Sequence, residues 1–144
     1  MQGTCLCGAV EFVITGTLPN IYQCHCSLCR KATGAAANAA LIVPGNQFQW
    51  VSGQACIHSY ENESGYRSDF CSKCGSPLPN PLKGTTDYWV PAGLLDGKAN
   101  LEVAAHLHVG SKATWEVIAA GGVHYQDAPD LDRLHQLLRK KVGA

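Results

Sequence analysis

The chain has 144 residues, 46% of them hydrophobic, which is enough to bury a substantial core and predicts one domain over residues 1–144. Eleven basic and eleven acidic residues cancel, and this neutrality excludes a general electrostatic attraction to nucleic acid or to an anionic membrane. The first residues lack the basic and apolar regions of a secretory signal, and polar residues interrupt the longest charge-free stretch too often for it to span a bilayer. We therefore expect a cytoplasmic protein with neither a nucleic-acid nor a membrane partner.

The first predicted element along the chain is a strand, since Val10, Phe12 and Ile14 alternate with their neighbours in the period-two pattern of a half-buried strand. Further segments of strand composition, separated by Gly, Pro, Asn and Ser residues, are 36–43, 48–51, 56–60, 66–70, 88–91 and 102–109. Together they predict a mainly β fold. The alanine-rich residues 35–40 would also suit a helix by propensity.

A clear helical period occurs only at the C-terminus, at about residues 129–142. The apolar stripe consists of Leu131, Leu134, Leu137, Leu138 and Val142. An Asp of the preceding Asp127-Ala128-Pro129-Asp130 segment can cap this helix, and Pro suits a first turn. Three basic residues, Arg139 to Lys141, lie at its end, where the helix dipole favours cations and where we expect a solvated surface.

Cysteine spacing carries the functional signal. Seven of the eight cysteines fall into three clusters, Cys5-x-Cys7, Cys24-x-Cys26-x-x-Cys29 and Cys71-x-x-Cys74. In a reducing compartment, thiols this close along a chain are typical of metal ligands rather than of disulfides. Four thiolates close a tetrahedral zinc site, whereas three leave one coordination position open for a substrate.

Spacing alone does not decide how the clusters combine. The pairs Cys26-x-x-Cys29 and Cys71-x-x-Cys74 resemble a zinc ribbon, but more residues separate them than the roughly 15–20 that are usual. The competing partition joins the first cluster to the last and leaves the middle three thiols together. These three either form an open site or are completed by a His or by Cys56, which is otherwise a small core residue.

The chain resembles the glutathione-dependent formaldehyde-activating enzyme family, also called the CENP-V/GFA domain, from residue 3 to about residue 115. The motifs that carry the resemblance are Gly3-x-Cys5-x-Cys7-Gly8-Ala9-Val10, Cys24-His25-Cys26-Ser27-x-Cys29-Arg30-Lys31, Arg67-x-x-Phe70-Cys71-x-x-Cys74-Gly75-Ser76, Gly93-Leu94-Leu95-Asp96 and the His106 to Trp115 stretch. The resemblance implies a zinc-containing β-tent of short antiparallel strands. It also implies up to two Zn2+ ions per chain, a structural ion on Cys5, Cys7, Cys71 and Cys74, and a catalytic ion on Cys24, Cys26 and Cys29.

The activity that the resemblance implies is that of a carbon–sulfur lyase, similar to S-(hydroxymethyl)glutathione synthase. Its substrates would be glutathione or a similar small thiol and formaldehyde or a related electrophile. His25 is a candidate general acid, with packing or a hydrogen bond beside the metal as the alternative. Arg30, Lys31 and Arg67 are candidates for binding the carboxylates of the thiol substrate.

The alternative function is a non-catalytic zinc module that binds a protein partner, and a homo-oligomer is also open. The remaining expectations concern single residues. His106 and His108 should share one strand face, as exposed or core residues rather than ligands. Trp89 and Trp115 should be core anchors, and Ser27 should cap the turn that leads to Arg30.

Overall fold

The computed structural model describes residues 1–141, which divide into two compact units. The first unit comprises Met1–Leu18 and Ile42–Ala99, and the second comprises Pro19–Leu41 and the described residues from Asn100 onward. Cys5, Cys7, Cys71 and Cys74 all lie in the first unit, and Cys24, Cys26 and Cys29 all lie in the second. Among the described residues, no helix is long and apolar enough to cross a membrane.

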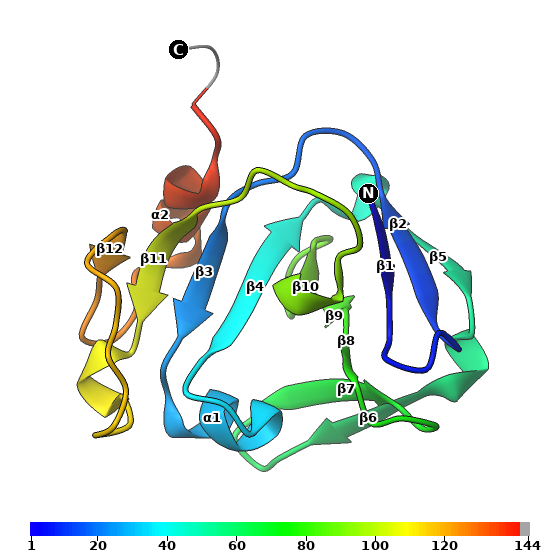
Figure 1. Ribbon diagram of the computed structural model, residues 1–144, viewed down its shortest axis with the longest axis horizontal. Coiled ribbons are helices and arrows are strands. Elements are labelled where there is room, and N and C mark those ends of the chain that lie inside the picture. The colour runs from blue at the N-terminus through cyan, green and yellow to red at the C-terminus, as the bar shows by residue number, and fades with distance from the viewer. Residues whose placement is uncertain (142–144) are drawn as a thin grey trace. The chain divides into compact units, whose positions relative to one another are not determined.

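The first unit is built from short antiparallel strands (Figure 1). One sheet has the order β1-β2-β5, formed by β1 (Gln2–Thr4), β2 (Glu11–Ile14) and β5 (Phe48–Ser52). A second has the order β6-β7-β8, formed by β6 (Ile57–Glu61), β7 (Arg67–Cys71) and β8 (Pro77–Leu78). An antiparallel pair consists of β9 (Asn80–Pro81) and β10 (Tyr88–Pro91).

Aromatic packing holds the β1-β2-β5 sheet on its buried face. Phe12 is fully buried, and its ring stacks on that of Phe48 with the centroids 5.4 Å apart. Phe48 stacks in turn on Tyr88 at 4.1 Å. A Cβ atom at Gly3 would lie 2.1 Å from the Phe12 ring, so only glycine fits opposite Phe12 in this sheet.

The second unit combines β-strands with two α-helices. Its strands have the order β12-β11-β3-β4, formed by β3 (Ile21–Cys24), β4 (Asn38–Val43) as far as Leu41, β11 (Val103–Leu107) and β12 (Val123–His124). Strand β11 runs parallel to both β3 and β12, whereas β3 and β4 are antiparallel. The α-helices are α1 (Ser27–Thr33) and α2 (Leu131–Leu138).

Helix α2 lies against β11 (Figure 1) and buries Leu134 and Leu138. The Asp130 carboxylate caps it by accepting a hydrogen bond of 2.8 Å from the backbone N–H of Arg133. Short 3-10 helices complete the described chain, at η1 (Gly45–Gln47), η2 (Gln54–Cys56), η3 (Ala92–Leu94) and η4 (Val109–Ser111).

The predicted mainly β class and the C-terminal helix are confirmed. The alanine-rich segment is strand β4 from Asn38 onward, not a helix. The prediction of a strand through residue 109 is wrong, because β11 ends at Leu107 and His108 turns the backbone with a φ of 55°. Pro129 precedes the cap of α2 instead of occupying its first turn, and Val142 lies outside the described residues.

Candidate metal centres

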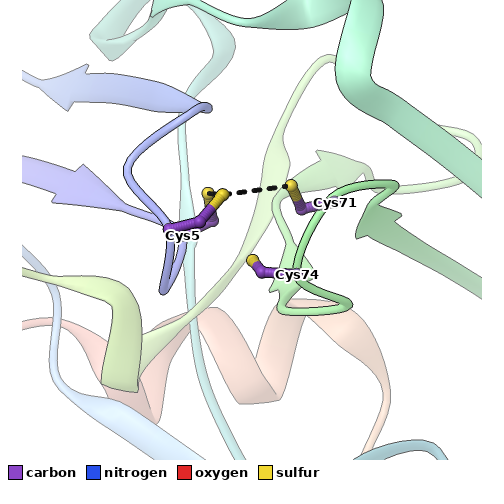
Figure 2. A group of neighbouring side chains, drawn as sticks. Cys5, Cys71 and Cys74 are labelled. Carbon is purple, nitrogen blue, oxygen red and sulfur yellow. Dashed lines mark hydrogen bonds between the residues drawn. The ribbon is translucent and has the colours of Figure 1, made fainter.

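The first group of thiols joins two turns of the first unit. The Sγ atoms of Cys5, Cys7, Cys71 and Cys74 all lie within 4.8 Å of one another. The Cys5–Cys7 Sγ distance is 3.6 Å and the Cys7–Cys71 distance is 3.9 Å. Figure 2 shows Cys71 and Cys74 on one turn, facing Cys5 on the other. A tetrahedral ion with Zn–S bonds of about 2.3 Å places its sulfur ligands roughly 3.8 Å apart, so these four thiols fit zinc.

Both turns of this group have the backbone hydrogen bonds that orient thiolates. The Gly75 N–H donates to the Cys71 carbonyl at 2.7 Å, and Gly75 adopts a φ of 77° just beyond the second cysteine. The Gly8 N–H donates to the Cys5 carbonyl at 3.1 Å in the same way. The Val10 N–H donates to Cys5 Sγ at 3.3 Å. The Cys5 and Cys71 side chains are therefore directed inward, where they pack with Val10 and Leu78 in a small buried core.

Ser76 connects the two turns directly. Its Oγ accepts a hydrogen bond of 2.9 Å from the Leu6 N–H and lies 3.3 Å from Cys74 Sγ. Hydrogen bonds from the side chain and then the backbone of Ser76 lower the pKa of the Cys74 thiol to about 5. A metal ligand must be deprotonated, so Ser76 helps to prepare this thiol. Ser76 ends the third family motif, but the sequence alone predicts no role for it.

The second group lies in the second unit, where two residues, His25 and Cys26, connect β3 to α1. Cys24 ends β3, Cys26 precedes α1 and the buried Cys29 lies within α1. Their three Sγ atoms lie within 4.8 Å of one another. Cys26 Sγ accepts a hydrogen bond of 3.3 Å from the Cys29 N–H, so Cys26 caps α1 and the prediction that Ser27 does so is wrong.

Within the part of the chain that the structure describes, this second group contains three candidate ligands and no fourth. Among the described residues, the clusters of three or more metal-binding side chains are these two, and the second includes neither a His nor Cys56. Three thiols with the same spacing limit as the first group also fit zinc, with one tetrahedral position left to an outside ligand. The metal assignments of all seven cysteines stay predictions.

His25, between Cys24 and Cys26, is fully buried, and both of its ring nitrogens have partners. Nδ1 lies 2.9 Å from the Glu116 carboxylate oxygen Oε2, and Nε2 lies 3.0 Å from Nδ1 of His106. Because a carboxylate only accepts, Nδ1–H of His25 is the donor to Glu116. This arrangement favours the hydrogen-bonding role that the sequence analysis set beside general acid catalysis.

His106 extends this buried chain of polar groups. Its ring is 2% exposed and lies edge-on to the His124 ring at 4.7 Å. Burial, followed by the nearby His124 and His25, lowers the pKa of His106. The prediction that His106 and His108 share a strand face is wrong, because His108 lies beyond the end of β11. Neither Glu116 nor the pairing of His25 with His106 had a signal in the sequence, since these residues are distant along the chain.

The three cations predicted to bind the substrate, Arg30, Lys31 and Arg67, have different surroundings. Arg30, on α1, donates from Nη2 to the Ser111 carbonyl at 3.4 Å, and its buried Nε has no hydrogen-bond partner among the described residues. Lys31 is exposed on the same helix. Arg67, in the first unit, holds Asp69 through two bonds of 2.8 and 2.9 Å, and this carboxylate raises the pKa of Arg67. Its charge is therefore already compensated.

The expectation that Trp115 anchors the core is wrong, because its side chain is 70% exposed. Val117, two residues further on, is 95% exposed. Both flank Glu116, whose own side chain is 11% exposed. The polar residue of this segment is thus the one that faces inward, toward His25.

The structure has two groups of cysteine thiols, one of four and one of three, and each could hold a metal ion. The family profile described as "Glutathione-dependent formaldehyde-activating enzyme" matches residues 1–111. The chain therefore belongs to the glutathione-dependent formaldehyde-activating enzyme family.

Individual proteins show the same likeness. A Halomonas elongata protein named "Putative glutathione-dependent formaldehyde-activating enzyme" is 31% identical over 93 residues, which cover 54% of this chain and 54% of that protein. The chain thus spans about half the length of this curated relative. A crystal structure of a Rhodobacter sphaeroides protein superposes with a TM-score of 0.56 at 26% identity, covering 69% of this chain and 92% of that one.

Proposed function

We propose that the protein is a zinc-dependent carbon–sulfur lyase, acting on adducts of a small glutathione-like thiol with formaldehyde or a related electrophile. The observation that carries this proposal is the group of Cys24, Cys26 and Cys29, which offers three thiolates and no fourth protein ligand among the described residues. A purely structural zinc site uses four protein ligands, whereas a catalytic site leaves a position for the substrate. Family membership supplies the substrate class.

Within this proposal the two thiol groups have separate tasks. Cys5, Cys7, Cys71 and Cys74 would hold a structural Zn2+, and Cys24, Cys26 and Cys29 would hold the second ion. A Zn2+ ion bound to these three thiolates would act as a Lewis acid and favour the thiolate form of a substrate thiol at neutral pH. We further propose one domain over residues 1–144, with the family motifs in residues 3–115. A cytoplasmic compartment would keep these thiols reduced.

The chain's own residues would bind and orient the substrate. Arg30 and Lys31 follow the second thiol group on α1, and a carboxylate of the thiol substrate could accept a hydrogen bond from the buried, unpartnered Nε of Arg30. Arg67 would need its remaining N–H groups for this purpose, since Asp69 occupies two of them.

The proposed reaction is an addition of a thiol to an aldehyde, or its reverse, and needs neither an oxidant nor a reductant. In the synthase direction the thiolate sulfur forms a bond to the aldehyde carbon, and the carbonyl oxygen gains a proton as its double bond opens. In the lyase direction the C–S bond breaks and the hydroxyl group loses that proton. His25 is the candidate that the sequence offers for this proton transfer, but both of its ring nitrogens already have hydrogen-bond partners. We therefore assign the transfer to water or to the substrate's own groups.

We expect the zinc-loaded protein to accelerate exchange between free glutathione and its formaldehyde adduct at equilibrium. Net yield is uninformative, because the uncatalysed reaction reaches the same equilibrium. NMR exchange spectroscopy with and without protein measures the rate directly. Cys26→Ser should lose the acceleration, and Cys56→Ser should retain it, because Cys56 lies outside both thiol groups. A zinc-loaded wild type without any effect on the rate would reject glutathione and formaldehyde as the substrates and leave another thiol, another electrophile or partner binding as the alternatives.

A further inference from the structure

Four hydrogen bonds join two residues beside the second thiol group, His25 and Arg30, to residues 106–116. The His25 N–H donates to the Leu107 carbonyl at 2.9 Å. The His25 ring is held between Glu116 and His106. Arg30, one residue after Cys29, donates to the Ser111 carbonyl at 3.4 Å.

These contacts restrict the thiols because of where His25 lies. Cys24 and Cys26 are its immediate neighbours, so a fixed His25 backbone and ring limit the directions of both flanking Cα–Cβ bonds. The His25 ring is fully buried and bonded at both nitrogens, which leaves it one orientation. A nitrogen that is bonded to Glu116 or His106 is also unavailable as a fourth metal ligand.

Glu116 is itself well placed to act as an anchor. Its backbone N–H donates to the Ala113 carbonyl at 3.1 Å, and its carbonyl accepts from Lys112 Nζ at 3.1 Å. Its carboxylate points inward, whereas the neighbouring Trp115 and Val117 side chains are exposed. The Glu116 carboxylate is therefore turned away from solvent, unlike its two neighbours, and contacts the His25 ring.

We propose that Glu116 and His106 are positioning residues that act through His25 to orient the Cys24 and Cys26 thiols and to keep the fourth ligand position beside Cys24, Cys26 and Cys29 free of His25. This inference rests on the proposed function, in which those three thiols bind the second ion. It assigns to Glu116 a role that depends on accepting a hydrogen bond from Nδ1–H, not on its negative charge. Glutamine keeps a hydrogen-bond acceptor without the charge, whereas alanine has neither. Comparing the two substitutions therefore distinguishes a role as hydrogen-bond acceptor from a role of the negative charge.

The test measures cobalt binding without any thiol or aldehyde. Protein carrying one equivalent of Zn2+, which fills the four-thiol site first, is titrated with Co2+, and the sulfur-to-cobalt absorption reports the second site. Glu116→Ala should weaken Co2+ binding about tenfold and alter the spectrum, because partners that orient a metal site typically contribute 10–100-fold to affinity. Glu116→Gln should bind within about twofold of wild type. The matched control is Glu102→Ala, which removes an exposed carboxylate from the same unit.

Equal Co2+ affinity and an equal spectrum for the wild type, Glu116→Ala and Glu116→Gln would overturn the proposal, as would loss of binding in both variants alike. If Glu116→Ala does not fold, the proposal can still be tested on the wild-type protein by NMR. In its 15N spectrum, His25 should carry a proton on Nδ1 that exchanges slowly with water, and a rapidly exchanging or unprotonated Nδ1 would contradict the proposal. Both readouts are independent of the lyase reaction, so a failed exchange assay rejects the proposed function without deciding the positioning role.

Discussion

Replacing Cys71 with serine is expected to lower the melting temperature by roughly 10 °C or more, or to yield insoluble protein. Cys71 is fully buried and packs with Cys5, Val10 and Leu78. Serine there removes one of four candidate zinc ligands and leaves a buried hydroxyl group in an apolar setting. Structural zinc sites contribute directly to folding free energy, so losing the ion should add to the packing defect. Thermal unfolding followed by circular dichroism measures the change.

The matched control for this substitution is Cys56→Ser. Cys56 packs against the same small core and belongs to neither thiol group, so its replacement tests packing without metal binding. Chelation provides a second control, because the difference between wild type and Cys71→Ser should shrink once zinc is removed from both. If Cys71→Ser and Cys56→Ser are destabilised equally in the presence of zinc, the four thiols do not form a structural site.

Replacing Cys26 with serine is expected to remove the second zinc equivalent while leaving the protein folded. Serine is a favourable N-cap, so its hydroxyl can replace Cys26 Sγ as acceptor for the Cys29 N–H. Helix α1 should then persist, and only the thiolate is lost. Elemental analysis of reduced protein should find about two zinc ions per wild-type chain and about one in the variant.

Cys26→Ala separates the two roles of this residue. It removes both the thiolate and the cap, and should cost about 1 kcal/mol more of folding stability than serine. Retention of two zinc ions by Cys26→Ser would contradict the assignment of Cys26 as a ligand. Unfolding of Cys26→Ser to the same degree as Cys71→Ser would instead make the middle thiols a second structural site.

Local pattern predicted much of the fold, because short strands carry their own signal. The alternation through Val10, Phe12 and Ile14 gives β2, and β10 has the predicted bounds Tyr88–Pro91. Helix α1 was missed since it has only seven residues and its cap is a cysteine, which sequence rules do not count among capping residues. Strands β1 and β3 were not predicted because neither has an apolar alternation: β1 (Gln2–Thr4) contains no large apolar residue, and in β3 (Ile21–Cys24) the apolar Ile21 and Tyr22 are adjacent.

The candidate site, like the fold, was predictable from the sequence only where the signal is local. Clustered spacing pointed to thiol ligands, but the choice between partitions of the clusters required the spatial grouping of Cys5 and Cys7 with Cys71 and Cys74. The partners of His25 could not be predicted, because His106 and Glu116 lie 81 and 91 residues away. No local rule connects residues at that separation. The parallel pairing of β11 with β3, which brings His106 beside His25, is likewise a tertiary feature.

The assignment of the reaction to the three-thiol site can be tested by measuring the exchange rate of glutathione and its formaldehyde adduct while zinc is added stepwise to reduced, metal-free protein. The four-thiol site should fill first, because it has one more protein ligand than the three-thiol site. We expect little acceleration up to one equivalent of zinc, a rise in the exchange rate during the second equivalent and a plateau at about two. A rate that rises fully with the first equivalent, or zinc binding that stops at one, would contradict the assignment of the reaction to Cys24, Cys26 and Cys29.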